Sequence, residues 1–304
     1  MTRACDSVRR ARPLLGTFVD VAASGGPRRV LEAAIESAFD AIAEIHRLMS
    51  VHVRTSDVSR LNRDAATRAV CVHPSTYRVL EMARDLHRRS AGTFDVAIAP
   101  AMEAHGLFPA SAEVRRRGPH VICGGESIEL LSGQRVRFHD PGVRIDLGGI
   151  AKGFAVDRAL DALRRHGASQ GLVNAGGDLA AFGPEVQTVH LRDPRDPSRV
   201  LCRIALRDGA LASTGGRLDP SVTAHAGAVP VIDPRRGRPV DGIAGATVRA
   251  SSCLVADALT KVVVVGGESA LGVLDHYGAS ALLVARDGSL RVTSDWPEAR
   301  RHAA

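Results

Sequence analysis

The pattern of apolar and polar positions changes period twice between residues 143 and 183. Residues 144–147 alternate polar and apolar side chains, which predicts a half-buried strand. From Ala151 the apolar residues recur at helical spacing, and Gly167 stands where a helix commonly ends. Residues 171–175 form a second short apolar run. The pattern therefore predicts a strand, a glycine turn, a helix, a strand and another glycine turn.

Each of the two glycine pairs, at 148–149 and 176–177, lies beside a carboxylate, Asp146 in the first case and Asp178 in the second. In an α/β-type unit, glycine turns at strand ends are where a phosphate-bearing ligand binds. Two tight turns without a ligand explain the same residues, so both interpretations stay open. The familiar nucleotide motifs do not match, since Lys152 precedes a glycine whereas a P-loop lysine follows one.

Elsewhere the pattern predicts helices and strands in mixed order. The predicted helices cover residues 31–49, 74–91 and 252–265. The predicted strands cover residues 14–21, 188–213 with a turn at 193–197, 247–250 and 281–285. Loops or hairpins are expected over residues 50–62, 113–140 and 212–216. Because helices and strands do not alternate strictly, we expect an α+β fold with two intimately packed mixed α/β subdomains.

Composition narrows the class of protein. The chain has 304 residues, of which 45% are hydrophobic and 24% charged, as in a globular protein with a large core. The net charge is +7, but aromatic residues make up only 3%, which argues against a stacking platform for single-stranded nucleic acid. The five cysteines are scattered without C-x-x-C spacing, which argues for a reducing compartment. We expect no membrane span and a cytoplasmic location for the sequence as given, or a periplasmic one if the N-terminus has been trimmed.

Four aspartates are candidates for chemistry. Asp95, Asp146 and Asp178 lie beside small-residue turns or helix starts, and Asp257 lies on a predicted helix between two alanines. Carboxylates completed by carbonyls at a glycine turn suit Mg²⁺ bound together with phosphates, whereas helix caps and solvated surface residues are the alternative. The 12 histidines show no zinc-ligand spacing. The hydroxyls at 213–214 are candidate nucleophiles, although in a small-residue loop they more often shape the backbone.

Eight short blocks occur in an order that resembles the ApbE family of FAD:protein FMN transferases, from about Arg10 to Gly267. Among them are G-T-F-D-V-A-I-A-P, I-D-L-G-G-I-A-K-G-F-A-V-D and L-V-N-A-G-G-D. The blocks cover residues 14–17, 50–62, 92–100, 145–157, 172–178, 213–216, 232–240 and 256–261.

The resemblance implies a single ApbE-like domain over residues 10–304 with the flavin site between its subdomains. It implies an enzyme that uses Mg²⁺ to transfer FMN from FAD to a Thr or Ser hydroxyl of an acceptor flavoprotein, with release of AMP. A catalytically weak protein that binds or delivers flavin, and an FAD pyrophosphatase, are the alternatives. The implied FAD-binding residues are Leu15, Thr93, Phe94, Asp95, Asp146, Lys152, Asp178 and Ile232. The implied metal ligands are Gly149, Asp257 and Thr260.

Two positions depart from the family pattern. The family has H-x-x-D-P where this chain has Pro230, and His225 lies five residues earlier. The family also places a threonine four residues after the metal-binding aspartate, where this chain has Lys261 and the threonine stands one residue early. A lysine there supplies a positive point charge.

Overall fold

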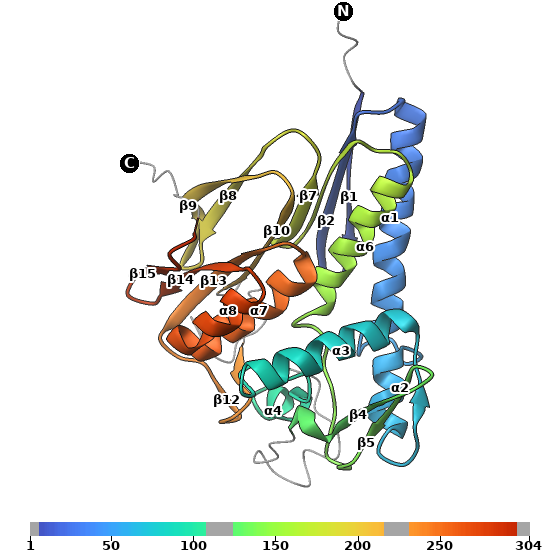
Figure 1. The fold of residues 1–304 in the computed structure, drawn as a ribbon, viewed down its shortest axis with the longest axis vertical. Helices are drawn as coiled ribbons and strands as arrows, with labels where there is room; N and C mark the ends of the chain where they lie inside the picture. Colours follow the sequence, from blue (N-terminus) through green and yellow to red (C-terminus); the bar gives the residue numbers. More distant parts are fainter. Residues whose placement is uncertain (1–5, 108–123, 216–230, 297–304) are drawn as a thin grey trace, which may run out of the picture.

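A large antiparallel sheet organises the protein in the computed structural model, which describes residues 6–107, 124–215 and 231–296 (Figure 1). Its eight strands follow the order β1-β2-β6-β7-β10-β13-β14-β15. Each neighbouring pair is antiparallel. The strands are β1 Ser7–Leu14, β2 Thr17–Ser24, β6 Gln170–Ala175, β7 Asp178–Phe182, β10 Gly209–Gly215, β13 Ile243–Ala250, β14 Ser280–Ala285 and β15 Leu290–Val292.

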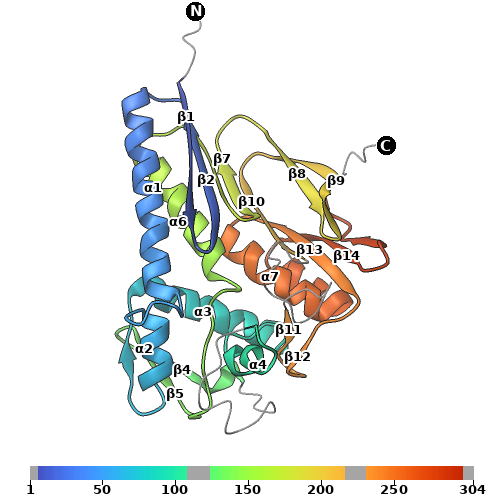
Figure 2. The same ribbon diagram turned by 180° about the vertical axis from the view of Figure 1, so that it is seen from behind.

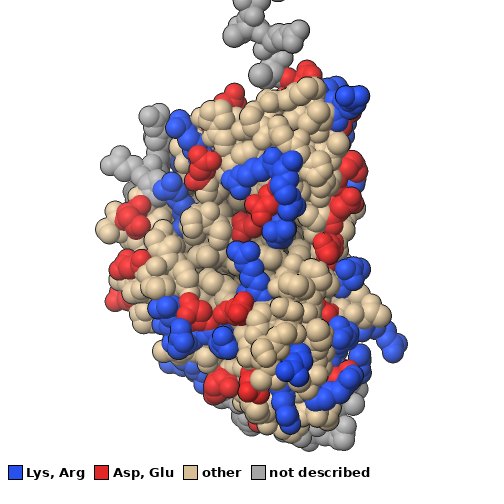
Figure 3. Space-filling view, turned by 45° about the vertical axis from the view of Figure 1, so that its right-hand side comes forward, with Lys and Arg blue, Asp and Glu red and all other residues tan. Residues whose placement is uncertain are grey.

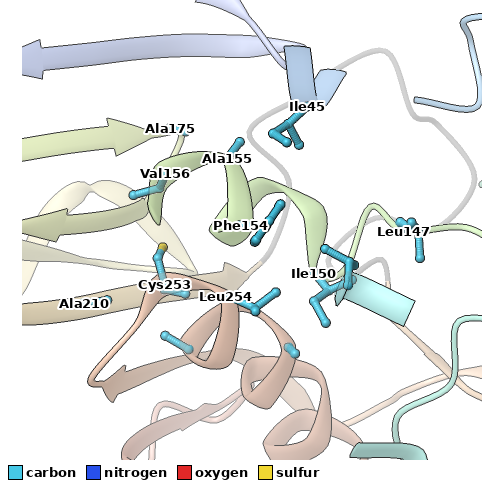
Figure 4. Close-up of a cluster of buried hydrophobic side chains, with 14 of the residues drawn as sticks. Ile45, Leu147, Ile150, Phe154, Ala155, Val156, Ala175, Ala210, Cys253 and Leu254 are labelled. Atoms are coloured by element: carbon cyan, nitrogen blue, oxygen red, sulfur yellow. The ribbon is translucent and has the colours of Figure 1, made fainter. Parts of the chain in front are cut away.

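Three helices, α1 (Arg28–Met49), α6 (Ala151–Arg165) and α7 (Cys253–Gly266), pack on one face of this sheet. Helices α1 and α6 lie side by side in both ribbon views (Figures 1 and 2). The close-up of the core shows Phe154 of α6 near Leu254 of α7 (Figure 4). Their apolar faces form the main core, which agrees with the helical periodicity of the sequence.

The opposite face of the sheet is covered by a hairpin of β8 (Gln187–Asp193) and β9 (Asp196–Leu206). Alternation along β10 separates the two cores, because Leu211 contributes to the core under the hairpin and its neighbours contribute to the core under the helices. The turn predicted at 193–197 is confirmed, since β8 ends and β9 begins within it.

A second subdomain lies below the sheet in Figure 1. It contains helices and a small antiparallel sheet of order β3-β5-β4. Its elements are α2 Asp57–Asp64, β3 Val70–Cys71, α3 Pro74–Arg89, α4 Ala99–Ala104, η1 Gly125–Ser127, β4 Ile128–Leu131 and β5 Arg135–Phe138. The remaining elements are β11 Ile232–Asp233, β12 Arg238–Pro239, η2 Gly267–Ala270 and α8 Leu271–His276. The expected α+β class with two packed subdomains is confirmed.

Four predictions about local structure are wrong. Residues 144–147 form no strand, and residues 212–215 belong to β10 rather than to a loop. The strand predicted over 14–21 is interrupted by a hairpin turn and continues as β2 only from Thr17. The turn places Leu15 and Gly16 at φ 56° and 71°, a conformation that a leucine rarely adopts and that the sequence pattern does not signal. The α/β-type unit is also wrong, because β6 pairs antiparallel with both β2 and β7.

Surface charges are mixed in sign. Basic and acidic side chains lie next to one another over the face drawn in Figure 3. Arginines in exposed ion pairs, such as Arg12 with Glu36 and Arg28 with Glu32, are in contact with solvent. Among the described residues, no helix is both long and apolar enough to cross a membrane.

Candidate functional site

The segment of residues 143–147 connects the two subdomains without forming a strand. The side chain of Asn62 on α2 donates to the carbonyl of Ile145 at 2.9 Å and accepts from its backbone N–H at 2.7 Å. The N–H of Asp146 donates to the carbonyl of Val96 at 2.9 Å. Since these bonds satisfy backbone groups that a sheet would otherwise pair, the segment needs no neighbouring strand and places Asp146 at the cavity.

A cavity of about 300 Å³ opens beside this segment. Its walls come from residues 93–102, the turn before α6, the end of β10, residues 231–234 and the side chain of Lys261 on α7. Seven of the predicted site residues line it, namely Thr93, Phe94, Asp95, Asp146, Gly149, Lys152 and Ile232. Residues far apart in the chain therefore meet at one place between the subdomains, as the sequence blocks predict.

Four predicted site residues do not line the cavity. Leu15 lies in the β1–β2 turn and packs against the main core. Asp178 at the start of β7 and Asp257 on α7 are buried behind the lysines that line the cavity. The hydroxyl of Thr260 is buried and donates to the carbonyl of Asp257 at 2.7 Å. Asp178 and Asp257 thus act on the cavity through their lysine partners.

Two ion pairs, each with a buried carboxylate, place lysine side chains on the cavity, which the carboxylates Asp95 and Asp146 also line. Lys152 at the start of α6 pairs with Asp178, and Lys261 on α7 pairs with Asp257. Burial by itself lowers the pKa of Lys152, but Asp257 and Asp178 outweigh that effect and raise it. Burial by itself raises the pKa of Asp257, but Lys152 and Lys261 hold it below its ordinary value. Lys152 therefore stays an ammonium group, which is suited to bind phosphate oxygens.

The carboxylate of Asp95 and the hydroxyl of Thr93 differ in their hydrogen bonds. The carboxylate of Asp95 accepts from the N–H groups of Ala97 at 2.7 Å and Gly125 at 2.8 Å, and lies 3.3 Å from Nδ1 of His87. Thr93 is only 4% exposed, and its hydroxyl has no hydrogen-bond partner among the described residues. Because such a group is costly to leave unpaired, the Thr93 hydroxyl indicates a place for a ligand atom.

The sequence did not predict several residues that the structure places in or beside the cavity lining. The apolar run after residue 95 belongs to the sequence block of residues 92–100, but only the structure shows that it forms a wall of the cavity. Asn62 and His87 hold Ile145 and Asp95 from outside the cavity, and only Asn62 belongs to a recognised block. The additional lining residues are Val96, Ile98, Met102, Gly148, Thr214, Val231, Pro234 and Lys261. Pro230 and His225 lie outside the described residues.

The predicted metal ligands do not form an oxygen cage. One carboxylate oxygen of Asp257 accepts from Lys261, and the other accepts from the N–H of Gly153 at 3.0 Å. The carbonyl of Asp257 accepts from Thr260 and, at 3.0 Å, from Lys261. Among the described residues no group of three His, Cys, Asp or Glu side chains could hold an ion. Mg²⁺ requires close octahedral oxygen ligands, so this donor set does not fit it, and the predicted ion stays a prediction.

Comparison with known proteins points to one family. The ApbE family model matches residues 15–283. A relative from Rhodobacter capsulatus, an FAD:protein FMN transferase, is 28% identical, with 93% of this chain covering 56% of that protein. A transferase of the same name from Vibrio cholerae is 25% identical, over 92% of this chain and 88% of the relative.

Solved structures agree in fold. An ApbE protein from Thermotoga maritima has a TM-score of 0.82 at 25% identity, covering 95% of this chain and 97% of the other. The flavin transferase ApbE from Vibrio cholerae has a TM-score of 0.78 at 24% identity, covering 95% and 98%. Since the family model spans most of the sequence, the chain belongs to the ApbE family.

Proposed function

We propose that the protein is an FAD:protein FMN transferase. In this reaction a Thr or Ser hydroxyl of an acceptor flavoprotein attacks the phosphorus of the FMN half of FAD. A bond forms between the hydroxyl oxygen and that phosphorus, while the bond from phosphorus to the bridging oxygen breaks. AMP leaves with the bridging oxygen, the hydroxyl proton passes to solvent, and FMN stays on the acceptor as a phosphoester. The names of the relatives support this transferase activity.

The observation that carries the proposal is the lining of the cavity. Two ammonium groups, on Lys152 and Lys261, share it with an apolar wall and with the unpartnered hydroxyl of Thr93. Ammonium groups match the charged pyrophosphate of FAD, and an apolar wall suits its flat rings. The apolar wall consists of Phe94, Val96, Ile98, Met102, Val231 and Ile232. The described part of the chain offers no donor set for the magnesium implied by the resemblance, and no step of the proposal passes through a metal.

Mass spectrometry tests the proposal. The protein is incubated with FAD and candidate acceptor flavoproteins, the intact mass of each acceptor is measured, and AMP is quantified by chromatography. We expect one acceptor to gain the mass of FMN with an equal amount of AMP. AMP and free FMN formed without acceptor would instead identify a pyrophosphatase. FAD binding with neither product would identify a flavin-delivery protein, and either result refutes the proposal.

Substitution at the cavity provides a matched comparison. Replacing Lys152 with Met removes one ammonium group from the cavity, and we expect at least about a tenfold loss of transfer, as for a charge-assisted contact to phosphate. Arg286→Met is the control, because Arg286 lies outside the cavity lining and pairs with the exposed Asp241 on the surface. Equal losses in the two variants would contradict the role of the cavity.

A further inference from the structure

The distribution of lysine in the sequence singles out the cavity. Of the 40 Lys and Arg residues, only two are lysines, Lys152 and Lys261. Both line the cavity, although they are more than a hundred residues apart in the chain. Wherever else this chain has a permanently basic side chain, it uses arginine. The sequence therefore has the compact ammonium group and flexible stem of a lysine at two positions, and both lie in the candidate site.

Lys261 bonds to the oxygens of Asp257 that a metal ion would need as ligands. Its ammonium donates to a carboxylate oxygen and to the carbonyl of Asp257, a residue that is fully buried. Its stem runs against Gly149, since Cε lies 3.4 Å from the place that a Cβ of Gly149 would take. Lys261 thus lies among the three residues predicted as metal ligands, Gly149, Asp257 and Thr260.

An ammonium group and a divalent cation exclude each other at this place. The ammonium has three donors and no lone pair, so it cannot serve as a ligand. It repels a nearby cation, and it takes up the carboxylate charge that would attract one. The two bonds to Asp257 use two of its three hydrogens, which leaves one for another acceptor among the described contacts. The side chain is 19% exposed, so this donor is accessible from the cavity.

We propose that Lys261 supplies from the chain itself the positive charge that a divalent cation would otherwise bring to the pyrophosphate of FAD. This inference rests on the proposed function, and it makes flavin binding independent of added metal. Lys152 provides the second ammonium donor for the pyrophosphate of FAD, and each ammonium group also has a carboxylate partner. Asp178 and Asp257 hold the two ammonium groups in place. Lys261 is then a substrate-binding residue, and the family's metal is absent from this member's reaction.

Binding measurements on the parent protein test the inference without any substitution. The affinity for FAD is measured by flavin fluorescence in EDTA and in Mg²⁺, and Mn²⁺ binding is followed by electron paramagnetic resonance. We expect the two FAD affinities to agree within about twofold and Mn²⁺ to bind no tighter than about 1 mM. Saturable Mn²⁺ binding in the micromolar range, or a loss of FAD affinity in EDTA of about tenfold or more, would overturn the inference.

The scarcity of lysine allows a direct footprint. Reductive methylation modifies amines, so the only targets are the two lysines and the terminal amine. We expect FAD to protect Lys152 and Lys261 from methylation to the same extent in EDTA and in Mg²⁺, with the terminal amine as internal control. Protection of Lys261 that requires Mg²⁺, or no protection of it, contradicts the proposal.

Two variants of Lys261 separate charge from packing. Lys261→Met removes the charge, and we expect FAD affinity in EDTA to fall at least about tenfold. Lys261→Thr provides an oxygen ligand, and we expect it to bind Mn²⁺ at least about tenfold more tightly than the parent and to regain FAD affinity in Mg²⁺. FAD affinity of Lys261→Met equal to that of the parent would refute the inference. A Lys261→Thr variant that binds Mn²⁺ no more tightly than the parent, and whose FAD affinity is the same in EDTA and in Mg²⁺, would refute it as well.

The two proposals fail in different ways. Because removal of Lys261 leaves Asp257 buried without its partner, Lys261→Met is also prepared together with Asp257→Asn to keep the protein folded. Metal-dependent FAD binding by the parent overturns the role of Lys261 and leaves the transferase proposal intact. FAD binding without transfer to any acceptor overturns the transferase and leaves the role of Lys261. A parent that binds no FAD overturns both.

Discussion

The close crossing of α6 and α7 at Gly153 provides the sharpest test of how the site is built. A Cβ added to Gly153 would lie 2.6 Å from the carbonyl carbon of Cys253, closer still to its carbonyl oxygen, and 2.8 Å from Cβ of Asp257. The obstacle is mostly backbone, which cannot rotate away. Gly153→Ala therefore requires the two helices to separate, and this also breaks the bond from the Gly153 N–H to Asp257.

The expected cost follows from three contributions. Forcing an extra methyl group into a packed core costs about 1–3 kcal/mol. Losing a hydrogen bond to a buried carboxylate costs about 1.5–3 kcal/mol. The higher helix propensity of alanine returns about 1 kcal/mol. We therefore expect Gly153→Ala to lower the free energy of unfolding by about 2–5 kcal/mol, and to lower Tm by roughly 3–8 °C for a chain of this size.

The assay combines thermal unfolding with flavin binding. Separation of the helices moves Lys152 on α6 away from Lys261 on α7, so FAD affinity is expected to fall together with Tm. The control is Gly272→Ala in α8, where an added Cβ meets nothing within 4 Å and where the change should be neutral or slightly stabilising. If Gly153→Ala melts within about 2 °C of the parent and binds FAD equally well, the argument from close packing is wrong.

Three further predictions concern residues around the cavity. Thr93→Val removes a buried hydroxyl that has no partner among the described residues, so Tm without flavin should stay equal or rise. FAD affinity measured by fluorescence should fall about fivefold. A lower Tm would show that the hydroxyl is already paired. Asn62→Ala removes both bonds to Ile145 and should cost about 2–4 kcal/mol in urea unfolding, whereas a cost below about 0.5 kcal/mol would rule out the clamp. The hydrogen bond to Asp95 raises the pKa of His87, with Glu126 adding to it and burial opposing it. The stabilisation from protonated His87 is then full below about pH 6.5 and disappears as the pH rises through the raised pKa. His87→Gln should therefore cost about 1 kcal/mol at pH 5.5 and little at pH 9, and a cost independent of pH would contradict this assignment.

The sequence predicts helices best where a single apolar stripe extends over several turns. The stripes of α1, α3, α6 and α7 place these helices within a few residues of their observed ends. Strands proved harder, because whether a segment becomes a strand depends on a partner that the segment does not contain. Residues 144–147 have the alternation of a strand, yet Asn62, 83 positions away from Ile145, takes the place of a neighbouring strand.

The residues of the site were likewise only partly predictable from the sequence. The order of the sequence blocks determined the family and seven residues of the cavity lining, because each block keeps its ligand-facing residues next to a glycine turn or a helix start. The buried positions of Asp178 and Asp257 could not be read from the blocks. Asp178 pairs with Lys152, 26 positions away, and this pair forms only when α6 packs against the sheet, whereas Asp257 and Lys261 pair locally, four residues apart on α7.

By itself the sequence determined the class of fold, the long helices and the neighbourhood of the site, because these depend on local spacing and short motifs. Only the tertiary structure decided that the alternating segment before α6 is not a strand and that Lys152 of α6 pairs with Asp178 of β7. In both cases a side chain from a different part of the chain pairs with the backbone groups or with the charge in question. Physical proximity, which sequence spacing does not encode, therefore determined the charge of the cavity.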